Sequence, residues 1–154
     1  MPGMLTSRGK YGVRAILHLA NSPGRTVGLA EIADAQHVPL KYLQQIFGAL
    51  KASGFVASRK GPGGGFSLAK APREIGLADL LRALDGPFAH FGCPSPEGPA
   101  DCGCPYPDAC PLREAFDAAR AAVHARLEGV TVADLVARRG EMEAELANVV
   151  DYVI

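Results

Sequence analysis

The four cysteines of the chain lie close together, and their thiols are the side chains most able to do chemistry. They are Cys93, Cys102, Cys104 and Cys110. Thiols gathered this tightly hold an inorganic centre or exchange electrons, whereas a buried structural cysteine behaves as a small apolar side chain. Structural disulfides are disfavoured, because cytosolic thiols stay reduced and because one glycine separates Cys102 from Cys104. The stretch therefore predicts a metal or redox-active site.

The net charge of zero conceals a division between the two halves of the chain. Residues 1–70 contain nine basic and two acidic residues, a net charge of +7, and residues 71–154 carry −7. A basic half indicates a polyanionic partner, although charge alone does not distinguish DNA from RNA or anionic lipid. No apolar stretch is long enough to span a bilayer, and the N-terminus lacks the pattern of a secretory signal. We therefore expect a cytoplasmic protein with no membrane partner.

Three helices are predicted before residue 54, each with one apolar stripe. The first begins at Thr6 or Ser7 and ends at a turn over 21–24, the second covers about 29–36, and the third begins near Pro39. The second and third are short and joined by a tight turn, which is typical of a helix-turn-helix motif. The side chains expected to be buried are Val13, Ile16, Leu17, Ala20, Leu29, Ile32, Ala33, Leu43, Ile46, Phe47 and Leu50.

The third helix presents a polar face opposite its apolar stripe. This face consists of Lys41, Gln44, Gln45, Gly48 and Lys51. Glutamine can hydrogen-bond adenine in the major groove, and lysine can contact phosphate or guanine. Most polar helix faces are simply solvated, but the position of this one in a helix-turn-helix favours a recognition helix.

A hairpin with a glycine-rich turn follows the third helix. Strands are expected over 55–58 and 66–68, joined by a turn that contains Arg59, Lys60 and several glycines. Glycines let a backbone approach another surface closely, so the hairpin indicates a wing that reaches phosphates or the minor groove. A nucleotide-binding loop is excluded, because no helix follows the glycines and neither standard glycine spacing is present.

The second half of the chain contains further helical patterns. One helix is expected over about 77–84, and a longer one over about 111–127. A short helix then begins near 131–136, and a separate helical stripe runs through 146–153. The long helix carries a near-heptad apolar seam suited to pairing with another helix, although packing on its own domain is the alternative. The seam is Leu112, Phe116, Ala119, Val123 and Leu127.

Four stretches of the chain, 5–14, 40–47, 59–66 and 129–135, carry a family resemblance. The chain resembles the IscR/NsrR-type family of small winged-helix bacterial transcription regulators. The resemblance implies a mainly α fold with a small β-hairpin wing. It also implies a winged helix-turn-helix DNA-binding domain over 1–86, a cysteine-rich sensor loop over 87–110, and a dimerisation helix with C-terminal helices over 111–154.

The family resemblance implies a homodimer that binds a partly palindromic double-stranded operator, with half-sites about one helical turn apart. We expect DNA contacts from Arg8, Lys41, Tyr42, Gln44, Gln45, Lys51, Arg59, Lys60, Gly63 and Gly64. An enzyme is not expected, since no histidine–carboxylate–nucleophile constellation is visible. The competing class is a small iron–sulfur or thiol redox protein.

The resemblance further implies a 2Fe-2S or 4Fe-4S cluster in the members that carry three cysteines. Such members often place five residues between neighbouring cysteines, and Cys104 and Cys110 keep this interval. Ten residues separate Cys93 from Cys104, and Cys102 is an additional cysteine. Four thiolates are the usual ligand set of either cluster type, so Cys102 is expected to complete it.

The fourth ligand of the family is absent from its usual positions. Where IscR-like members have a histidine this chain has Arg113, and where NsrR-like members have an acid it has Lys10. Neither arginine nor lysine is a plausible iron ligand at neutral pH, which leaves His90 as the reserve candidate. Structural zinc is a second interpretation, weakened by the absence of paired CxxC motifs. A metal-free thiol switch is the third.

Overall fold

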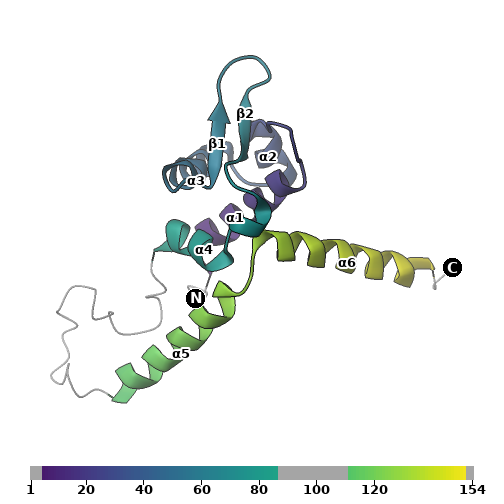
Figure 1. Ribbon diagram of the computed structural model, residues 1–154. Helices are drawn as coiled ribbons and strands as arrows, with labels where there is room; N and C mark the ends of the chain where they lie inside the picture. Colours follow the sequence, from purple (N-terminus) through teal and green to yellow (C-terminus); the bar gives the residue numbers. More distant parts are fainter. Residues whose placement is uncertain (1–4, 87–110, 152–154) are drawn as a thin grey trace.

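The computed structural model describes residues 5–86 and 111–151 (Figure 1). It is mainly α-helical with one antiparallel two-stranded sheet, as the sequence predicts. The elements are α1 (Ser7–Ala20), α2 (Leu29–Gln36), α3 (Leu40–Ala52), β1 (Val56–Arg59), β2 (Gly65–Leu68), the 3-10 turn η1 (Pro72–Glu74), α4 (Leu77–Asp85), α5 (Pro111–Glu128) and α6 (Val132–Asp151).

The hydrophobic core lies between α1, α2, α3 and α4, with the hairpin at one end (Figure 1). The stripe predicted for α3 is confirmed, since all four of its apolar residues are buried. Phe47 of α3 contacts Phe66 of β2 edge to face, with ring centroids 4.6 Å apart. The largest fully buried side chains are Phe47, Ile16, Ile32, Leu43, Ile46, Leu50, Ile75, Leu80, Val27 and Val132.

The buried face of α1 differs from the predicted stripe. Ile16 is buried as expected, and Val13, Leu17 and Ala20 are partly buried and pack against the core. The buried face is wider than the stripe, because Gly9, Gly12, Ala15 and Leu19 are also buried. A Cβ atom added at Gly12 would lie 2.3 Å from Leu84 Cδ1, so the missing side chain is what lets α4 approach this closely. Hydropathy counts a glycine as neutral, which is why the apolar pattern alone left Gly9 and Gly12 out of the predicted face.

The start of α1 is joined to the end of α4 through Thr6. The predicted cap is confirmed, because Thr6 Oγ1 accepts a hydrogen bond from the Gly9 N–H at 3.1 Å. The Thr6 hydroxyl also donates to Asp85 Oδ1. Asp85 is the last residue of α4, and its carboxylate lies near the positive end of the α1 dipole.

The hairpin pairs Val56 with Leu68 and Arg59 with Gly65, so each strand lies within one residue of its predicted place. A third extended segment joins it from the chain between α1 and α2. Val27 and Phe66 exchange two backbone hydrogen bonds of 2.8 Å. The hairpin is therefore fixed to the helical core by backbone pairing as well as by the Phe47–Phe66 contact.

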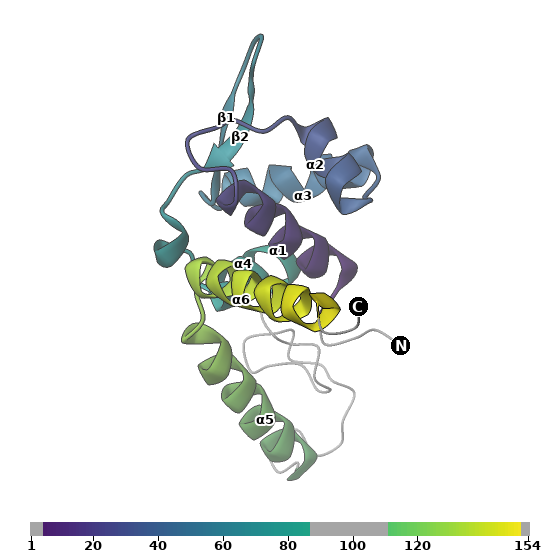
Figure 2. The same cartoon turned by 90° about the vertical axis from the view of Figure 1, so that its right-hand side faces the viewer.

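The two C-terminal helices diverge from the body of the molecule (Figures 1 and 2). The prediction of a short helix followed by a separate helical segment is wrong, because α6 runs unbroken from Val132 to Asp151. Ion pairs along the helix support this continuity, since Arg138 contacts Glu141 and Glu145 at 2.9 and 3.0 Å, and Arg139 contacts Glu143 at 2.7 Å. These exposed pairs span the middle of the helix, where Gly140 weakens it.

The first turn of α6 belongs to the hydrophobic core. Val132 is fully buried, and its N–H donates to the Ile75 carbonyl at 2.9 Å. The Leu77 N–H donates to the Val130 carbonyl at 2.8 Å, so the junction of α5 and α6 is paired with the junction of η1 and α4. Within the two described ranges, no helix is both long and apolar enough to cross a membrane.

We expect Gly12→Ala to lower the free energy of unfolding by about 1–3 kcal/mol, because the added methyl group overpacks the contact with Leu84. Gly48→Ala is the matched control. Gly48 lies in the middle of α3 with no atom within 4 Å of an added Cβ, so alanine should stabilise the helix by about 0.5–1 kcal/mol. Urea denaturation of both variants measures the difference, and equal stabilities would contradict this packing of α1 against α4.

Candidate nucleic-acid interface

The polar face of α3 is exposed along its whole length. Lys41, Gln44, Gln45, Gly48 and Lys51 are all exposed, while the opposite face of the helix is buried. The prediction that these five residues share one accessible face is therefore confirmed. An exposed row of amides, with a lysine at each end and a glycine in place of a bulky side chain, is suited to contact a groove of duplex DNA.

The turn between α2 and α3 sets the direction of this face. His37 lies in the left-handed region, with φ 53° and ψ 49°, and ends α2. The Val38 side chain is buried directly after it, and Pro39 caps α3. This single residue turns the chain out of α2, because a residue in the left-handed region cannot continue a right-handed helix.

Aromatic and basic side chains gather at the start of α3. Tyr42 packs edge to face against Tyr11 of α1, with ring centroids 6.2 Å apart, and is only half-buried. Lys10 Nζ lies 4.7 Å from the centroid of the Tyr11 ring. Arg14 donates to the Gln36 carbonyl at 2.8 Å and to its side-chain oxygen at 3.0 Å. These contacts join α1 to the helix-turn-helix, and Arg8 lies exposed one turn before Tyr11.

The end of α3 is joined to the hairpin by a contact that the sequence reasoning missed. Lys51 Nζ donates a hydrogen bond to Ser58 Oγ on β1 at 2.6 Å. Lys51 remains exposed, so its charge is accessible while its position is fixed. Ser58 is exposed, as are all residues of β1 except Val56, but no local pattern in the sequence could have paired it with Lys51.

The wing, defined as β1, β2 and the turn 60–64, presents Arg59 and Lys60 as exposed cations. Its glycines have first of all a structural role. A Cβ atom at Gly64 would lie 2.4 Å from the Arg59 carbonyl oxygen, and Gly63 has φ +69°. A Cβ atom at Gly65 would lie 2.4 Å from the Val27 carbonyl oxygen. The turn therefore requires glycine for its own fold, whatever Gly63 and Gly64 contact outside it.

Few acidic groups oppose the basic half of the chain. Glu31, one of only two acids before residue 71, forms an exposed ion pair with Arg25 at 2.6 Å. The hydrogen bond from Arg25 lowers the pKa of the Glu31 carboxyl group, so this carboxylate keeps its charge and its partner. The ion pair joins α2 to the preceding turn. Glu31 is thus paired with Arg25 and does not neutralise the charges of Lys41, Lys51 or the wing.

The cysteines predicted as metal ligands, Cys93, Cys102, Cys104 and Cys110, lie outside the described residues, as does His90. In residues 5–86 and 111–151, no three or more His, Cys, Asp or Glu side chains come together as a metal site. Lys10, which stands where some members of the family have an acidic ligand, has its ammonium group over the ring of Tyr11. The described part of the chain thus offers no donor set that competes with the four thiols.

Comparison with known proteins shows which family shares this sequence. Residues 5–138 match the Rrf2 family, which is described as an iron-dependent transcriptional regulator. A putative helix-turn-helix transcriptional regulator of Rhodobacter capsulatus is 33% identical over 87% of this chain and 93% of its own. The transcriptional regulator IscR of Serratia proteamaculans is 35% identical over 86% of this chain and 78% of its own.

Two solved structures share the architecture. The structure of T. potens IscR is 27% identical, with a TM-score of 0.73, over 90% of this chain and 89% of that one. The structure of CymR, the global cysteine regulator of B. subtilis, is 29% identical, with a TM-score of 0.70, over 87% and 96%. The family match covers most of the chain, the fold is a helix-turn-helix with a basic wing, and the relatives are regulators rather than enzymes. The chain therefore belongs to the Rrf2 family of transcriptional regulators.

Proposed function

We propose that the protein acts in the cytoplasm as a homodimer that binds an operator in double-stranded DNA, with an affinity set by the state of the four cysteines. The observation that carries the DNA-binding part is the polar face of α3 beside the wing. Five exposed residues of α3 and two exposed cations of the wing belong to elements joined by the bond from Lys51 to Ser58.

The two parts of this surface have different roles in the proposal. Gln44 and Gln45 read base edges in the major groove, because their amides can donate and accept at adenine. Lys41, Lys51, Arg59 and Lys60 bind phosphates, as does Arg8, and they supply most of the affinity without selecting sequence. Tyr42 remains a proposed DNA contact, and its packing against Tyr11 also supports the first turn of α3.

Exposed apolar side chains on the C-terminal helices support dimerisation. The 18 residues of α5 extend about 27 Å, and Phe116, Val123 and Leu127 remain only half-buried in the single chain. On α6, Met142 and Leu146 are 50% and 65% exposed. Apolar surface of this kind is typical of an interface, and a second copy of the chain would bury it.

The donor set of the cysteine stretch fits an iron–sulfur cluster. Cys93, Cys102, Cys104 and Cys110 would hold it, since four thiolates are a complete ligand set. When bound, such a cluster supplies a centre that responds to oxidants, nitric oxide or iron supply. The description of the family as iron-dependent supports this assignment over zinc.

A metal-free thiol switch is the second candidate. One similar structure, 25% identical with a TM-score of 0.67, is of Staphylococcus aureus CymR in an oxidized form. Structural zinc on the four thiolates is chemically sufficient but lacks paired CxxC motifs. A small redox protein without a DNA target is disfavoured, because it would need neither the wing nor the polar face of α3.

The end of α4, which precedes the cysteine stretch in the sequence, is connected to the DNA-binding elements. Asp85 ends α4 two residues before Pro87, and it accepts a hydrogen bond from the Thr6 hydroxyl at the N-cap of α1. From there Tyr11 contacts Tyr42 in the first turn of α3. A difference of about 1–3 kcal/mol in DNA affinity between two states of the cysteines would be an ordinary allosteric coupling.

Substitutions on the two parts of the DNA-binding surface should have separable effects. Arg59→Ala should weaken binding to every duplex and reduce the slope of log affinity against log salt by about one. Gln44→Ala should instead remove about 1–3 kcal/mol of base discrimination at one position in each half-site. Arg73→Ala, which removes an exposed charge from η1, is the control. Gel-shift titrations against fragments of the gene's own promoter region measure all three, and wild-type behaviour of the first two variants would refute the assignment.

The oligomeric state tests the role of α5. Sedimentation of the native chain should give about twice its mass of 16.1 kDa. Val123→Asp should produce monomers, because it places a charge in the apolar seam. Ala121→Asp makes the same change at an exposed position of α5 and should leave the dimer intact. A monomeric native protein at micromolar concentration would contradict the proposal.

The cysteine centre has a direct spectroscopic test. Protein purified without oxygen should be brown, with visible charge-transfer absorption that is lost in Cys110→Ala. His90→Ala should keep its colour if the four thiolates form the whole ligand set. Colourless protein with one equivalent of zinc would contradict the cluster and support structural zinc. Colourless protein without metal would support the thiol switch.

A further inference from the structure

The extended segment between α1 and α2 lies alongside the wing and contacts it at two levels. At the base of the wing, Val27 pairs with Phe66 through two backbone hydrogen bonds. Nearer the tip, Thr26 Oγ1 donates to the Gly63 carbonyl oxygen at 2.9 Å. In the part of the chain that the structure describes, this is the one side-chain hydrogen bond that reaches the turn 60–64.

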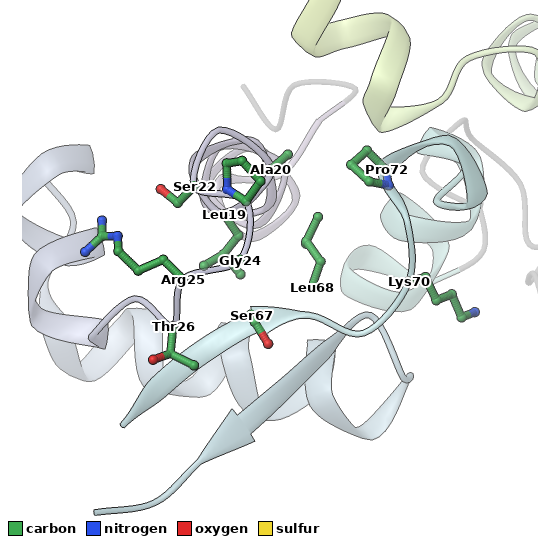
Figure 3. Close-up of a pocket in the computed structure, with 11 residues that line it drawn as sticks. Leu19, Ala20, Ser22, Gly24, Arg25, Thr26, Ser67, Leu68, Lys70 and Pro72 are labelled. Carbon is green, nitrogen blue, oxygen red and sulfur yellow. The ribbon is translucent and has the colours of Figure 1, made fainter. Parts of the chain in front are cut away.

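The residues of this segment that precede Val27 line a pocket (Figure 3). The pocket, of about 380 Å³, lies between the end of α1 and β2, and Thr26 and Ser67 are among its lining residues. The Leu68 side chain points into it, whereas the charged ends of Arg25 and Lys70 point away. Packing therefore does little to fix the residues that precede Val27, and hydrogen bonds must hold them in place.

The turn that Thr26 reaches has high intrinsic freedom. Gly61 and Gly63 have φ of +93° and +69°, and neither would meet any atom within 4 Å of an added Cβ. Glycine loses more conformational entropy on ordering than any other residue, so an unsupported turn of this composition would sample many shapes. A bond to the Gly63 carbonyl restricts those shapes before any ligand binds, which is how preorganisation improves affinity.

We infer that Thr26 is a positioning residue for the wing: its hydroxyl holds the Gly63 carbonyl and thereby directs Arg59 and Lys60 toward the DNA backbone. The inference rests on the proposed DNA-binding function. Thr26 makes no contact with DNA in this account. Its contribution is to fix, in the free protein, the turn that carries the two cations.

Equilibrium binding of a fluorescent duplex from the gene's own promoter region tests the role of the hydroxyl. Thr26→Val keeps the shape of the side chain and removes the donor, so affinity should fall about three- to tenfold, the effect of one lost hydrogen bond. Thr26→Ser keeps the donor and should bind within about twofold of the native chain. Ser67→Ala, at the rim of the same pocket, removes a hydroxyl that does not reach the turn 60–64 and should bind as the native chain does.

A double-mutant cycle separates a positioning role from a general loss of stability. Lys60→Ala should weaken binding strongly in the native background and much less in the Thr26→Val background, because both changes act through the same turn. A merely structural role for Thr26 would give independent effects that add. Additive losses would therefore overturn the inference, as would full affinity of Thr26→Val or failure of Thr26→Ser to restore binding.

The native chain in the same assay distinguishes the two levels of the proposal. If it binds no duplex in any metal or oxidation state, the DNA-binding function itself fails, and the role of Thr26 fails with it. If the native chain binds and Thr26→Val binds equally well, only the positioning role is wrong.

Discussion

The contact between Phe47 and Phe66 fixes the position of the wing relative to α3, and these two elements together form the proposed DNA-binding surface. The rings meet edge to face at 4.6 Å, with Phe47 fully buried in α3 and Phe66 on the returning strand of the wing. Because protein cores are close-packed, neither element can shift without disturbing this pair. The polar face of α3 and the cations of the wing are therefore held on a common support, reinforced by Lys51–Ser58 outside and Val27–Phe66 beside it.

Glycine recurs at the points where two elements approach each other closely. Gly12 admits α4 against α1, and Gly65 admits the Val27 carbonyl against the wing. The first approach brings the end of α4 against α1, and the second brings the segment before α2 against the wing. The first places Asp85 on the Thr6 cap at the start of α1, so the end of α4 and the DNA-binding elements form one connected structure.

Local patterns in the sequence predicted the parts of the fold that depend on local spacing. The stripe of α3, the Thr6 cap, the hairpin and the exposed polar face all follow from helical or strand periodicity and turn residues. The full width of the buried face of α1 did not, because it includes Gly9 and Gly12, which have no side chains to mark it. The continuity of α6 was missed because the prediction followed apolar residues, whereas charged pairs three and four residues apart line the middle of this helix. The contacts of Thr26 and Val27 with the wing were missed, since their partners are distant in sequence, although the Thr–Val pair before Gly28 does indicate a short extended segment. The bond from Lys51 to Ser58 spans only seven residues, but it joins a helix to a strand, and periodicity within one element does not predict such a contact. The predicted cysteine ligands lie outside the described residues.

Hydrogen–deuterium exchange with and without a promoter duplex is the most direct test of a shared DNA-binding surface. Added duplex should slow amide exchange in α3 and in the wing together. Exchange in α6, which lies away from this surface, should change little. Protection of one element without the other would contradict their joint action. Protection of neither, with binding observed, would place the DNA on a different surface altogether.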